Sequence, residues 1–375
     1  MKKNCIFSLL LLFYFTQGNC QLVETLVEHP KIKDGMYVDA QGNIYTTSGG
    51  LQNGTEIGKY DVVTDIYDFN FQNGFFGPID IDEKSNGNFV VTNYDNDSVS
   101  EVDLNTGVVD VIATGLDGPA GIAIDDNDNI YVSNFGAPPN YTGHQIHKIT
   151  PGGSVSVLAD SPLLFRFQAM VFNGEGELIV SSQDKLLKVD TETGAIEIWV
   201  DLGNIGFGHM IYRELDSSIY GTATNESKIY KIDANATLSI YAGSVAGYQD
   251  GDLGTALFNA PLGLEISPNE NILYVGDSSR LRRIIMDITL GTEEQDLNKH
   301  VIYPNPSSNG LFSITNSKRE AIFIEVFDQA GRLLFSRMDG SHRIGLDLSL
   351  QVQGIYNVRL TYDSQVFYKR IVKYN

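Results

Sequence analysis

Residues 118–134 read GPAGIAIDDNDNIYVSN, and this stretch decides the fold of most of the chain. Two apolar runs, 121–125 and 130–133, flank a turn rich in Asp and Asn, which is the composition that tight hairpins prefer. Two further β-like runs follow at 145–149 and 154–159. One copy of the pattern therefore predicts a unit of four antiparallel strands.

The same pattern recurs along the chain. The apolar pair of each second strand marks a copy, and the pairs are Ile44-Tyr45, Phe89-Val90, Ile130-Tyr131, Leu178-Ile179, Ile219-Tyr220 and Leu273-Tyr274. Six four-stranded units with a period of roughly 45 residues predict a six-bladed β-propeller. A β-like stretch at 22–27 precedes the first copy, and we expect it to be the outer strand of the last blade, where it would close the ring and cover a sheet edge.

A second unit occupies residues 301–375. Its opening Tyr303-Pro304-Asn305-Pro306 fixes two φ angles and removes two N–H donors, so it can begin an edge strand but not a helix. Short runs with apolar residues at every second position follow, separated by turn signals at Asn309-Gly310, Gly331 and Gly354. This spacing predicts a small antiparallel β-sandwich. The whole chain is therefore expected to be all-β, with a propeller at 21–290, a polar linker at 291–300 and the sandwich at 301–375.

Residues 1–20 have the order of a secretory leader, with Lys2 and Lys3 before an apolar run and small residues after it. Both cysteines, Cys5 and Cys20, lie in this leader. Cleavage before Gln21 would leave a mature chain without thiols, which excludes disulfides and cysteine-based catalysis. Past the leader, no apolar run approaches membrane length, so we expect no membrane span in the mature chain.

The charge is divided unevenly between the two units. Residues 21–300 contain 15 basic and 41 acidic residues, a net charge of −26, whereas residues 301–375 contain nine basic and six acidic residues. A body this acidic would repel a phosphate backbone, so nucleic acid is excluded as a partner. Solubility is the simplest explanation of the negative charge of residues 21–300. Binding of metal cations or of cationic ligands is an alternative explanation that the charge leaves open.

The tail resembles the type A C-terminal sorting domain of the type IX secretion system of Bacteroidota. The residues that carry the resemblance are Tyr303, Pro304, Asn305, Pro306, Asn309, Gly310, Gly331, Gly354 and Tyr356, followed by the basic ending Lys369-Arg370-Ile371-Val372-Lys373. The resemblance implies export through the Sec pathway and periplasm and then across the outer membrane, to the cell surface or the medium. It also implies two partners, the type IX machinery and its C-terminal signal peptidase. An accessory β-domain that binds carbohydrate or protein is the alternative.

The repeats resemble those of NHL-type and gluconolactonase-like propellers. The resemblance is clearest in blade six, at 241–243 (YAG), 250–252 (DGD), 256–264 (ALFNAPLGL) and 273–277 (LYVGD). Such propellers bind peptides, proteins, nucleic acids or small ligands, and some relatives are lyases or lactonases, so the scaffold leaves the function open. We favour a module that binds an extracellular ligand or protein over an enzyme. A secreted, lactonase-like hydrolase or lyase acting at the channel mouth is the alternative.

An enzyme of this fold needs polar residues that converge on the axis of the ring. Aligning the copies places these residues at the mouth: Asp34, about Phe76 or Gly77, Ala120, Gln168, His209 and Leu262. His209 could act as a general base or metal ligand, with Asp34 as carboxylate and Gln168 as hydrogen-bond donor. A structural role for His209 is the alternative. The motifs with glutamate and Asn-Gly that hold the cation in lactonases are not evident here.

A second set of polar residues ends the second strands, and Asn93, Asn134 and Asp277 are its strongest candidates for a calcium site. Calcium needs six to eight oxygen ligands, which several blades could supply together. Asn and Asp at strand ends also cap turns through local hydrogen bonds, and we favour that explanation here. The same turn-capping explanation applies to the run at 125–129 (DDNDN), because this run lacks the glycine and glutamate of an EF-hand loop.

The irregular connection at 135–144 (FGAPPNYTGH) is the preferred place for ligand contacts. Long loops on rigid scaffolds carry function often. The candidate contacts are Tyr94, Asn134, Phe135, Tyr141 and His144.

Overall fold

The structure is a computed structural model of the 375-residue chain. It describes residues 21–32, 34–49, 54–165, 168–286, 302–315, 322–329, 331–341, 343–362 and 365–374. The predicted leader at 1–20 and linker at 291–300 lie outside the described residues.

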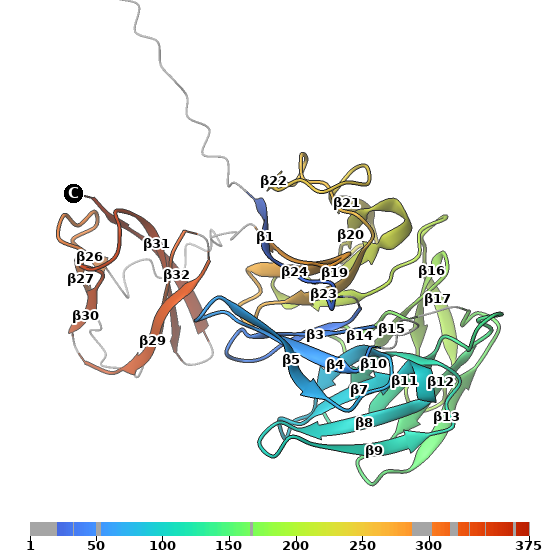
Figure 1. Ribbon diagram of the computed structural model, residues 1–375. Coiled ribbons are helices and arrows are strands. Elements are labelled where there is room, and N and C mark those ends of the chain that lie inside the picture. Colours follow the sequence, from blue (N-terminus) through green and yellow to red (C-terminus); the bar gives the residue numbers. More distant parts are fainter. Residues whose placement is uncertain are drawn as a thin grey trace, which may run out of the picture.

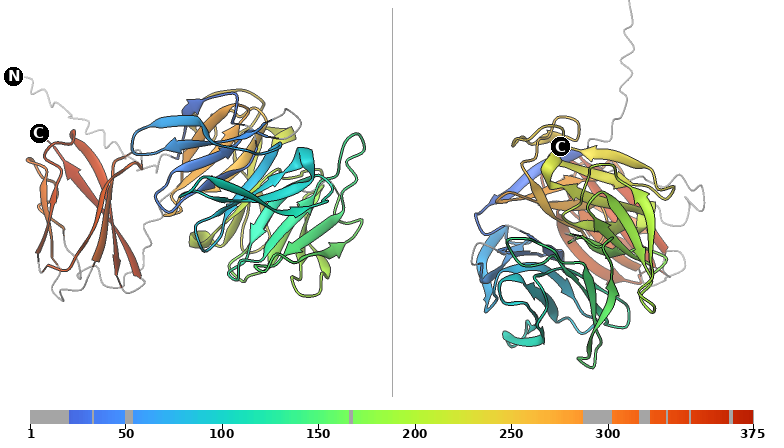
Figure 2. Two further views of the ribbon diagram at one scale, coloured as in Figure 1. Left: turned by 60° about the horizontal axis from the view of Figure 1, so that its bottom comes forward. Right: turned by 90° about the vertical axis from the view of Figure 1, so that its right-hand side faces the viewer.

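The body is a ring of six antiparallel sheets (Figures 1 and 2). Blade one consists of β2 (Met36–Val38), β3 (Ile44–Thr47), β4 (Glu56–Asp61) and β5 (Ile66–Asn73). Blade two consists of β6 (Pro78–Glu83), β7 (Phe89–Asn93), β8 (Ser98–Asp103) and β9 (Val108–Thr114), with a 3-10 turn, η1 (Tyr94–Asn96), after β7. Blade three consists of β10 (Pro119–Ile124), β11 (Ile130–Asn134), β12 (Gln145–Ile149) and β13 (Val155–Asp160).

The second half of the ring repeats this order. Blade four consists of β14 (Met170–Phe172), β15 (Leu178–Ser182), β16 (Lys185–Val189) and β17 (Ile196–Asp201). Blade five consists of β18 (Met210–Arg213), β19 (Ser218–Ala223), β20 (Lys228–Ile232) and β21 (Leu238–Ala242), with 3-10 turns η2 (Glu214–Asp216) and η3 (Thr224–Glu226). Blade six contains β23 (Pro261–Ile266), β24 (Ile272–Asp277) and β25 (Arg280–Ile285). The predicted six-bladed propeller is confirmed.

Strand β1 (Leu22–Glu28) completes blade six from the other end of the chain, as predicted. It pairs antiparallel with β25, from Leu22 opposite Ile285 to Glu28 opposite Arg280. The short β22 (Gly251–Asp252) then pairs with the outer side of β1. This clasp, formed by β1, β22 and β25, joins the two ends of the propeller and leaves no unpaired edge on β25.

The hydrophobic core lies between neighbouring blades. Six clusters of buried side chains each draw residues from two adjacent sheets, and the series continues from blade six to blade one, where Leu281 and Ile272 pack with Met36 and Ile44. The second strands are buried on both faces, as in β7 and β11. Burial on both faces explains why these strands gave the strongest sequence signal.

Threonine hydroxyls fix the inner strands of adjacent blades against one another. Thr47 Oγ1 donates to Ile79 O at 2.8 Å, Thr92 Oγ1 to Ala120 O at 2.6 Å and Thr222 Oγ1 to Leu262 O at 2.6 Å. Each acceptor belongs to the first strand of the next blade. The bonds therefore set the positions from which side chains reach the channel.

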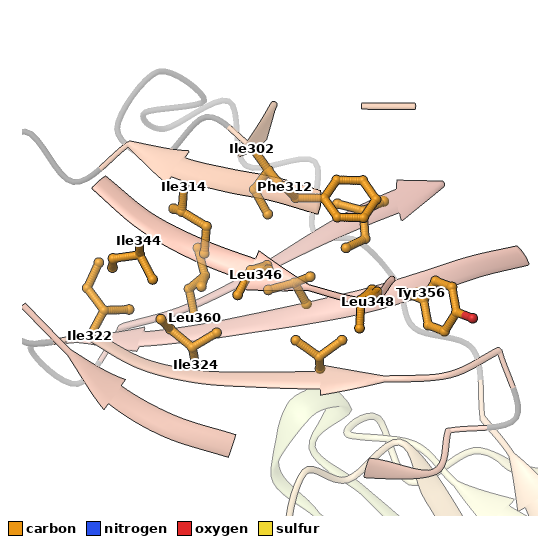
Figure 3. Packing of buried hydrophobic residues seen from close by; sticks show 13 residues of the cluster. Ile302, Phe312, Ile314, Ile322, Ile324, Ile344, Leu346, Leu348, Tyr356 and Leu360 are labelled. Carbon is orange, nitrogen blue, oxygen red and sulfur yellow. The ribbon is translucent and has the colours of Figure 1, made fainter. Parts of the chain in front are cut away.

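The tail is a β-sandwich of two sheets (Figure 3). One contains β26 (Ile302–Tyr303), β27 (Leu311–Thr315) and β30 (Arg343–Asp347), and the other contains β28 (Ile322–Phe327), β29 (Leu333–Asp339), β31 (Gly354–Tyr362) and β32 (Gln365–Lys373). Alternate residues such as Phe312, Ile324 and Leu346 meet between the sheets. The predicted sandwich and its two-residue periodicity are confirmed. None of the described residues belongs to a helix long and apolar enough to cross a membrane.

Candidate functional site

Asp34, Gln168 and His209 meet at one mouth of the channel. The side-chain nitrogen of Gln168 lies 3.3 Å from Asp34 Oδ1 and 2.9 Å from His209 Nε2. An amide nitrogen only donates, so His209 Nε2 accepts and the ring proton resides on Nδ1. That Nδ1 lies 3.7 Å from Asp80 Oδ1. The predicted convergence is present, and Asp80 is a fourth member that sequence analysis did not find.

The four residues come from blades on opposite sides of the ring. Asp34 precedes β2 of blade one and Gln168 precedes β14 of blade four, while Asp80 belongs to β6 of blade two and His209 precedes β18 of blade five. In a ring of six, blade one faces blade four and blade two faces blade five. Asp34, Asp80, Gln168 and His209 therefore form a polar crossbar that spans this mouth of the channel.

Burial keeps the inner part of the crossbar close to neutral. Desolvation lowers the pKa of His209 to about 4, with Asp34 acting weakly in the opposite direction. Desolvation raises the pKa of Asp80 to about 7, although its carboxylate accepts N–H bonds from Ile81 at 3.0 Å and Ile122 at 2.9 Å. A neutral imidazole whose Nε2 lone pair is already engaged is a poor general base near pH 7.

A cavity of about 290 Å³ continues from the crossbar along the first strands. Asp82 and Glu265 line it together with Asp80, and burial raises the pKa of Asp82 to about 7 and that of Glu265 to about 8. Its lining contains no Lys or Arg among the described residues. The only sequence signal for Asp80 and Asp82 was the alternation Ile79-Asp80-Ile81-Asp82, which also fits an ordinary half-exposed strand.

The structure changes the predicted mouth position of blade two. Phe76 and Gly77 lie in the loop before β6, and Asp80 of β6 reaches the crossbar instead. A register shift between Pro78 and Ile81 displaces the start of this strand relative to β7. The same shift occurs in β10, where Ile122 pairs with Val132 as Ile81 pairs with Val91, so the spacing in blade two is ordinary and the predicted position was three to four residues too early.

Two of the three strand-end residues proposed as calcium ligands, Asn93 and Asp277, make local bonds in separate blades. Asn93 Oδ1 accepts from Phe76 N at 3.1 Å, and Asp277 binds Asn259 N at 2.7 Å and Arg282 at 2.9 Å. Asn134 is buried at the end of β11. Likewise Asp125 accepts from Asn127 N and Asn129 N, both at 2.9 Å, which is the predicted Asx-type turn. Within the described ranges, no three His, Cys, Asp or Glu residues are grouped so as to hold a metal ion.

The connection at 135–144 is held in place by bonds to the same mouth. The hydroxyl of Tyr94 donates to Gly136 O at 2.7 Å, and Gly136 N donates to Asp117 O at 3.2 Å. Phe135 and Tyr141 pack edge to face with ring centroids 5.7 Å apart. Tyr94 is buried and supports the loop through its bond to Gly136 O, and Asn134 is buried as well. His144 lies at the end of the loop, where it pairs with Asp160 at 2.8 Å.

Most of the motif residues of the tail gather at one end of the sandwich. Tyr303, Pro304, Asn305 and Pro306 lead out of β26, Asn309 and Gly310 form the turn before β27, and Gly354 and Tyr356 begin β31. Gly331 lies apart, in the turn between β28 and β29. Residues 301–374 match the family model described as the secretion system C-terminal sorting domain.

The tail is a C-terminal sorting domain. It marks the protein as one exported to the cell surface or beyond the cell. The expected type IX sorting tail is therefore confirmed. The family match ends before the last residue and covers the tail alone, so it assigns no activity to the propeller.

Solved structures resemble the propeller. An auxiliary nutrient-binding protein from Bacteroides ovatus is 18% identical, with a TM-score of 0.59, over 71% of this chain and 76% of its own. A gluconolactonase from Xanthomonas campestris is 11% identical, with a TM-score of 0.58, over 71% and 90%. Virginiamycin B lyase from Staphylococcus aureus is 12% identical, with a TM-score of 0.52, over 71% and 99%. At these identities the likeness shows the fold alone. No curated protein matches the sequence.

Proposed function

We propose that the propeller is an extracellular binding module. Its ligand contacts the face of the ring at which the crossbar spans the mouth of the channel. The observation that carries this proposal is the fixed loop at 135–144, which holds the aromatic pair Phe135 and Tyr141 beside the closed mouth. A preorganised aromatic surface binds a ring or an apolar face without first ordering the loop. The auxiliary nutrient-binding proteins of similar fold support a small solute as the ligand.

The electrostatics of the crossbar favour binding over catalysis. Gln168 occupies the only lone pair of the His209 ring, and burial lowers the pKa of that ring to about 4. Catalysis by His209 would first require Gln168 to move away. The crossbar is therefore assigned a positioning role, in which it closes the ring and supports the face around it.

A library screen with the mature protein, residues 21–375, tests the proposal. Monosaccharides, oligosaccharides, amino acids and lactones are screened by thermal shift, and hits are measured by calorimetry. We expect Phe135→Ala and Tyr141→Ala to weaken binding by about tenfold each. Val157→Ala is the matched control, since Val157 is exposed on the outer strand of the same blade. A ligand whose affinity is unchanged in both aromatic variants would contradict the assigned face.

A secreted hydrolase or lyase is the second candidate, and one observation favours it. Asp34, Gln168 and His209 do converge within hydrogen-bonding distance, as that function requires. The likeness to a gluconolactonase and to virginiamycin B lyase suggests lactones as test substrates. Turnover that disappears in His209→Gln and persists in Phe135→Ala would replace the binding proposal with this one.

A further inference from the structure

Most sequence motifs of the sorting domain, although far apart along the chain, are connected by one set of contacts. Asn305 Nδ2 donates to Arg370 O at 2.7 Å, and Asn305 Oδ1 accepts from Val372 N at 2.9 Å. Ser307 N donates to Val372 O at 2.8 Å, and Tyr374 N donates back to Ser307 O at 3.0 Å. The opening Tyr-Pro-Asn-Pro segment therefore runs beside the basic C-terminal strand.

The same end of the sandwich holds the loop at 348–352. Leu348 N donates to Gly310 O at 2.8 Å, which ties the loop to the Asn309-Gly310 turn. Gly310 has φ +73°, and a Cβ there would lie 2.7 Å from Leu348 O, so this contact requires glycine. Figure 3 shows Leu348 and Tyr356 close together at this end of the core.

Two side chains from the motifs bind the backbone of this loop. Lys373 Nζ donates to Ser349 O at 2.7 Å and also to Gln351 O. Tyr356 Oη donates to Val352 O. Lys373 is 9% exposed and Tyr356 is 2% exposed, so both donors approach the loop from inside. A buried ammonium group must form such bonds to offset its loss of hydration.

Because these bonds fix the loop, two of its aliphatic side chains are exposed to solvent. With three loop carbonyls turned toward the domain, Leu350 is 97% exposed and Val352 is 79% exposed. Single exposed aliphatic residues are common on proteins. Here the backbone beneath the two side chains is fixed by a buried lysine and a buried tyrosine. We call Leu350 and Val352 the apolar knob.

We propose that the apolar knob is the part of the sorting domain that enters an apolar pocket of the export machinery. Most of the motifs then have a physical role: Gly310, Tyr356 and Lys373 hold the loop, and the opening segment holds the strand that carries Lys373. A fixed backbone lets the knob bind without ordering a loop, so most of the gain from burying two aliphatic side chains is kept. The partner surface is concave and apolar.

The test compares full-length variants in a bacterium that has this export system. Leu350→Ser/Val352→Ser removes the knob, and Met338→Ser is the control, because Met338 is 65% exposed on β29 of the same domain. Secreted and periplasmic fractions are measured by immunoblot. We expect the double variant to lose about tenfold or more of its export and the control to lose none. Normal export of the double variant would overturn the proposal.

Two further measurements test for misfolding and for association between copies of the chain. Equal melting temperatures of the purified variants exclude misfolding, and Leu350→Met/Val352→Ile, which keeps the knob apolar, is expected to restore export. A photo-crosslinker at position 350 should join the chain to a component of the outer membrane, whereas adducts between two copies of this chain would overturn the assignment. Deletion of residues 301–375 tests the sorting role itself. Normal export of that deletion would refute sorting, whereas blocked export with a normal double variant would refute only the knob.

Discussion

The buried side chain of Arg282 donates hydrogen bonds to four other residues of the propeller. It is 1% exposed on β25, and its guanidinium donates to Asp277 and Leu257 O through one nitrogen and to Asp250 and Gln249 O through the other. Asp250 in turn accepts from Thr25 of β1. One side chain therefore connects blade six, the segment before it and the clasp.

Arg282→Met should destabilise the propeller by about 3–5 kcal/mol, because it leaves the buried Asp277 without its partner. Arg280→Lys is the control on the same strand, since Arg280 pairs with a largely exposed Glu28 and should cost less than about 1 kcal/mol. Urea unfolding followed by tryptophan fluorescence measures both. Equal losses in the two variants would show that Arg282 contributes no more than a surface ion pair.

The pKa shifts of Asp80 and His209 predict opposite effects of pH on the free energy of unfolding. Burial raises the pKa of Asp80 to about 7, so between pH 3.8 and 7 the folded state holds a proton that the unfolded state has released, and stability falls as pH rises. Burial lowers the pKa of His209 from 6.5 to about 4, so between these values the unfolded state binds more protons and stability rises with pH.

Asp80→Asn removes only the first of these effects. The free energy of unfolding of the wild type, minus that of Asp80→Asn, should therefore decrease from pH 4 to pH 7, at most by about 1.4 kcal/mol per pH unit. Urea unfolding at intervals of half a pH unit measures the difference. Val157→Ala, which changes no titratable group on the exposed strand β13, should give a constant difference. A difference that is constant for Asp80→Asn as well would mean that Asp80 is ionised throughout.

Sequence alone located three of the four crossbar residues, because the repeat alignment places Asp34, Gln168 and His209 at equivalent mouth positions. It did not locate Asp80, because the alignment placed the mouth position of blade two three to four residues before it, although Ile81 pairs with Val91 as Ile122 pairs with Val132 in blade three. The sequence also could not show that Gln168 forms hydrogen bonds with Asp34 and His209 across the ring. That result depends on which blades stand opposite, and therefore on ring closure.

At the scale of elements, the clasp should be the most sensitive point of the ring. Val23 is fully buried between β25 and β22 in blade six. Val23→Asp buries a charge without a partner and should cost about 3–5 kcal/mol. Val157→Asp, on the exposed outer strand β13, should cost less than about 1 kcal/mol. Similar melting temperatures for the two variants would show that the ring is stable without the clasp.

Calcium is expected to have no effect on thermal stability, because Asn93 and Asp277 already bind groups within their own blades. A ligand that binds only the folded state raises the melting temperature in proportion to its occupancy. Melting in EDTA and in millimolar calcium should therefore give the same midpoint. A midpoint that rises with calcium would establish the site suggested by the sequence.

Strand identities followed from sequence more reliably than strand ends. All six second-strand markers lie in second strands, because these strands are buried on both faces and read as continuous apolar runs. The third strand of blade three matches its predicted bounds, 145–149. The first strand of blade three begins earlier than predicted, at Pro119. A proline at the start of a strand loses no ladder bond there, so its presence did not mark a boundary.

At the scale of the whole molecule, we expect the sorting domain to be needed for export and not for folding of the propeller. Deleting residues 301–375 removes the domain that directs export and leaves the propeller cores intact. We expect a folded propeller to accumulate in the periplasm, as measured by cell fractionation and protease resistance. Delivery of the deleted protein to the surface at the normal level would contradict this expectation, and a protease-sensitive product would show that the propeller needs its tail to fold.

The clasp also makes completion of the ring a late event, because a chain is synthesised from its N-terminus. Residues 22–28 emerge first, yet they pair with 280–285, so the contact that completes the ring spans almost the entire propeller. Closing so long a loop is entropically costly and must await the last blade. The export signal lies beyond that blade. Every strand of the ring therefore precedes the sorting domain in the chain, so the partners needed for ring closure are all synthesised before the domain that directs export.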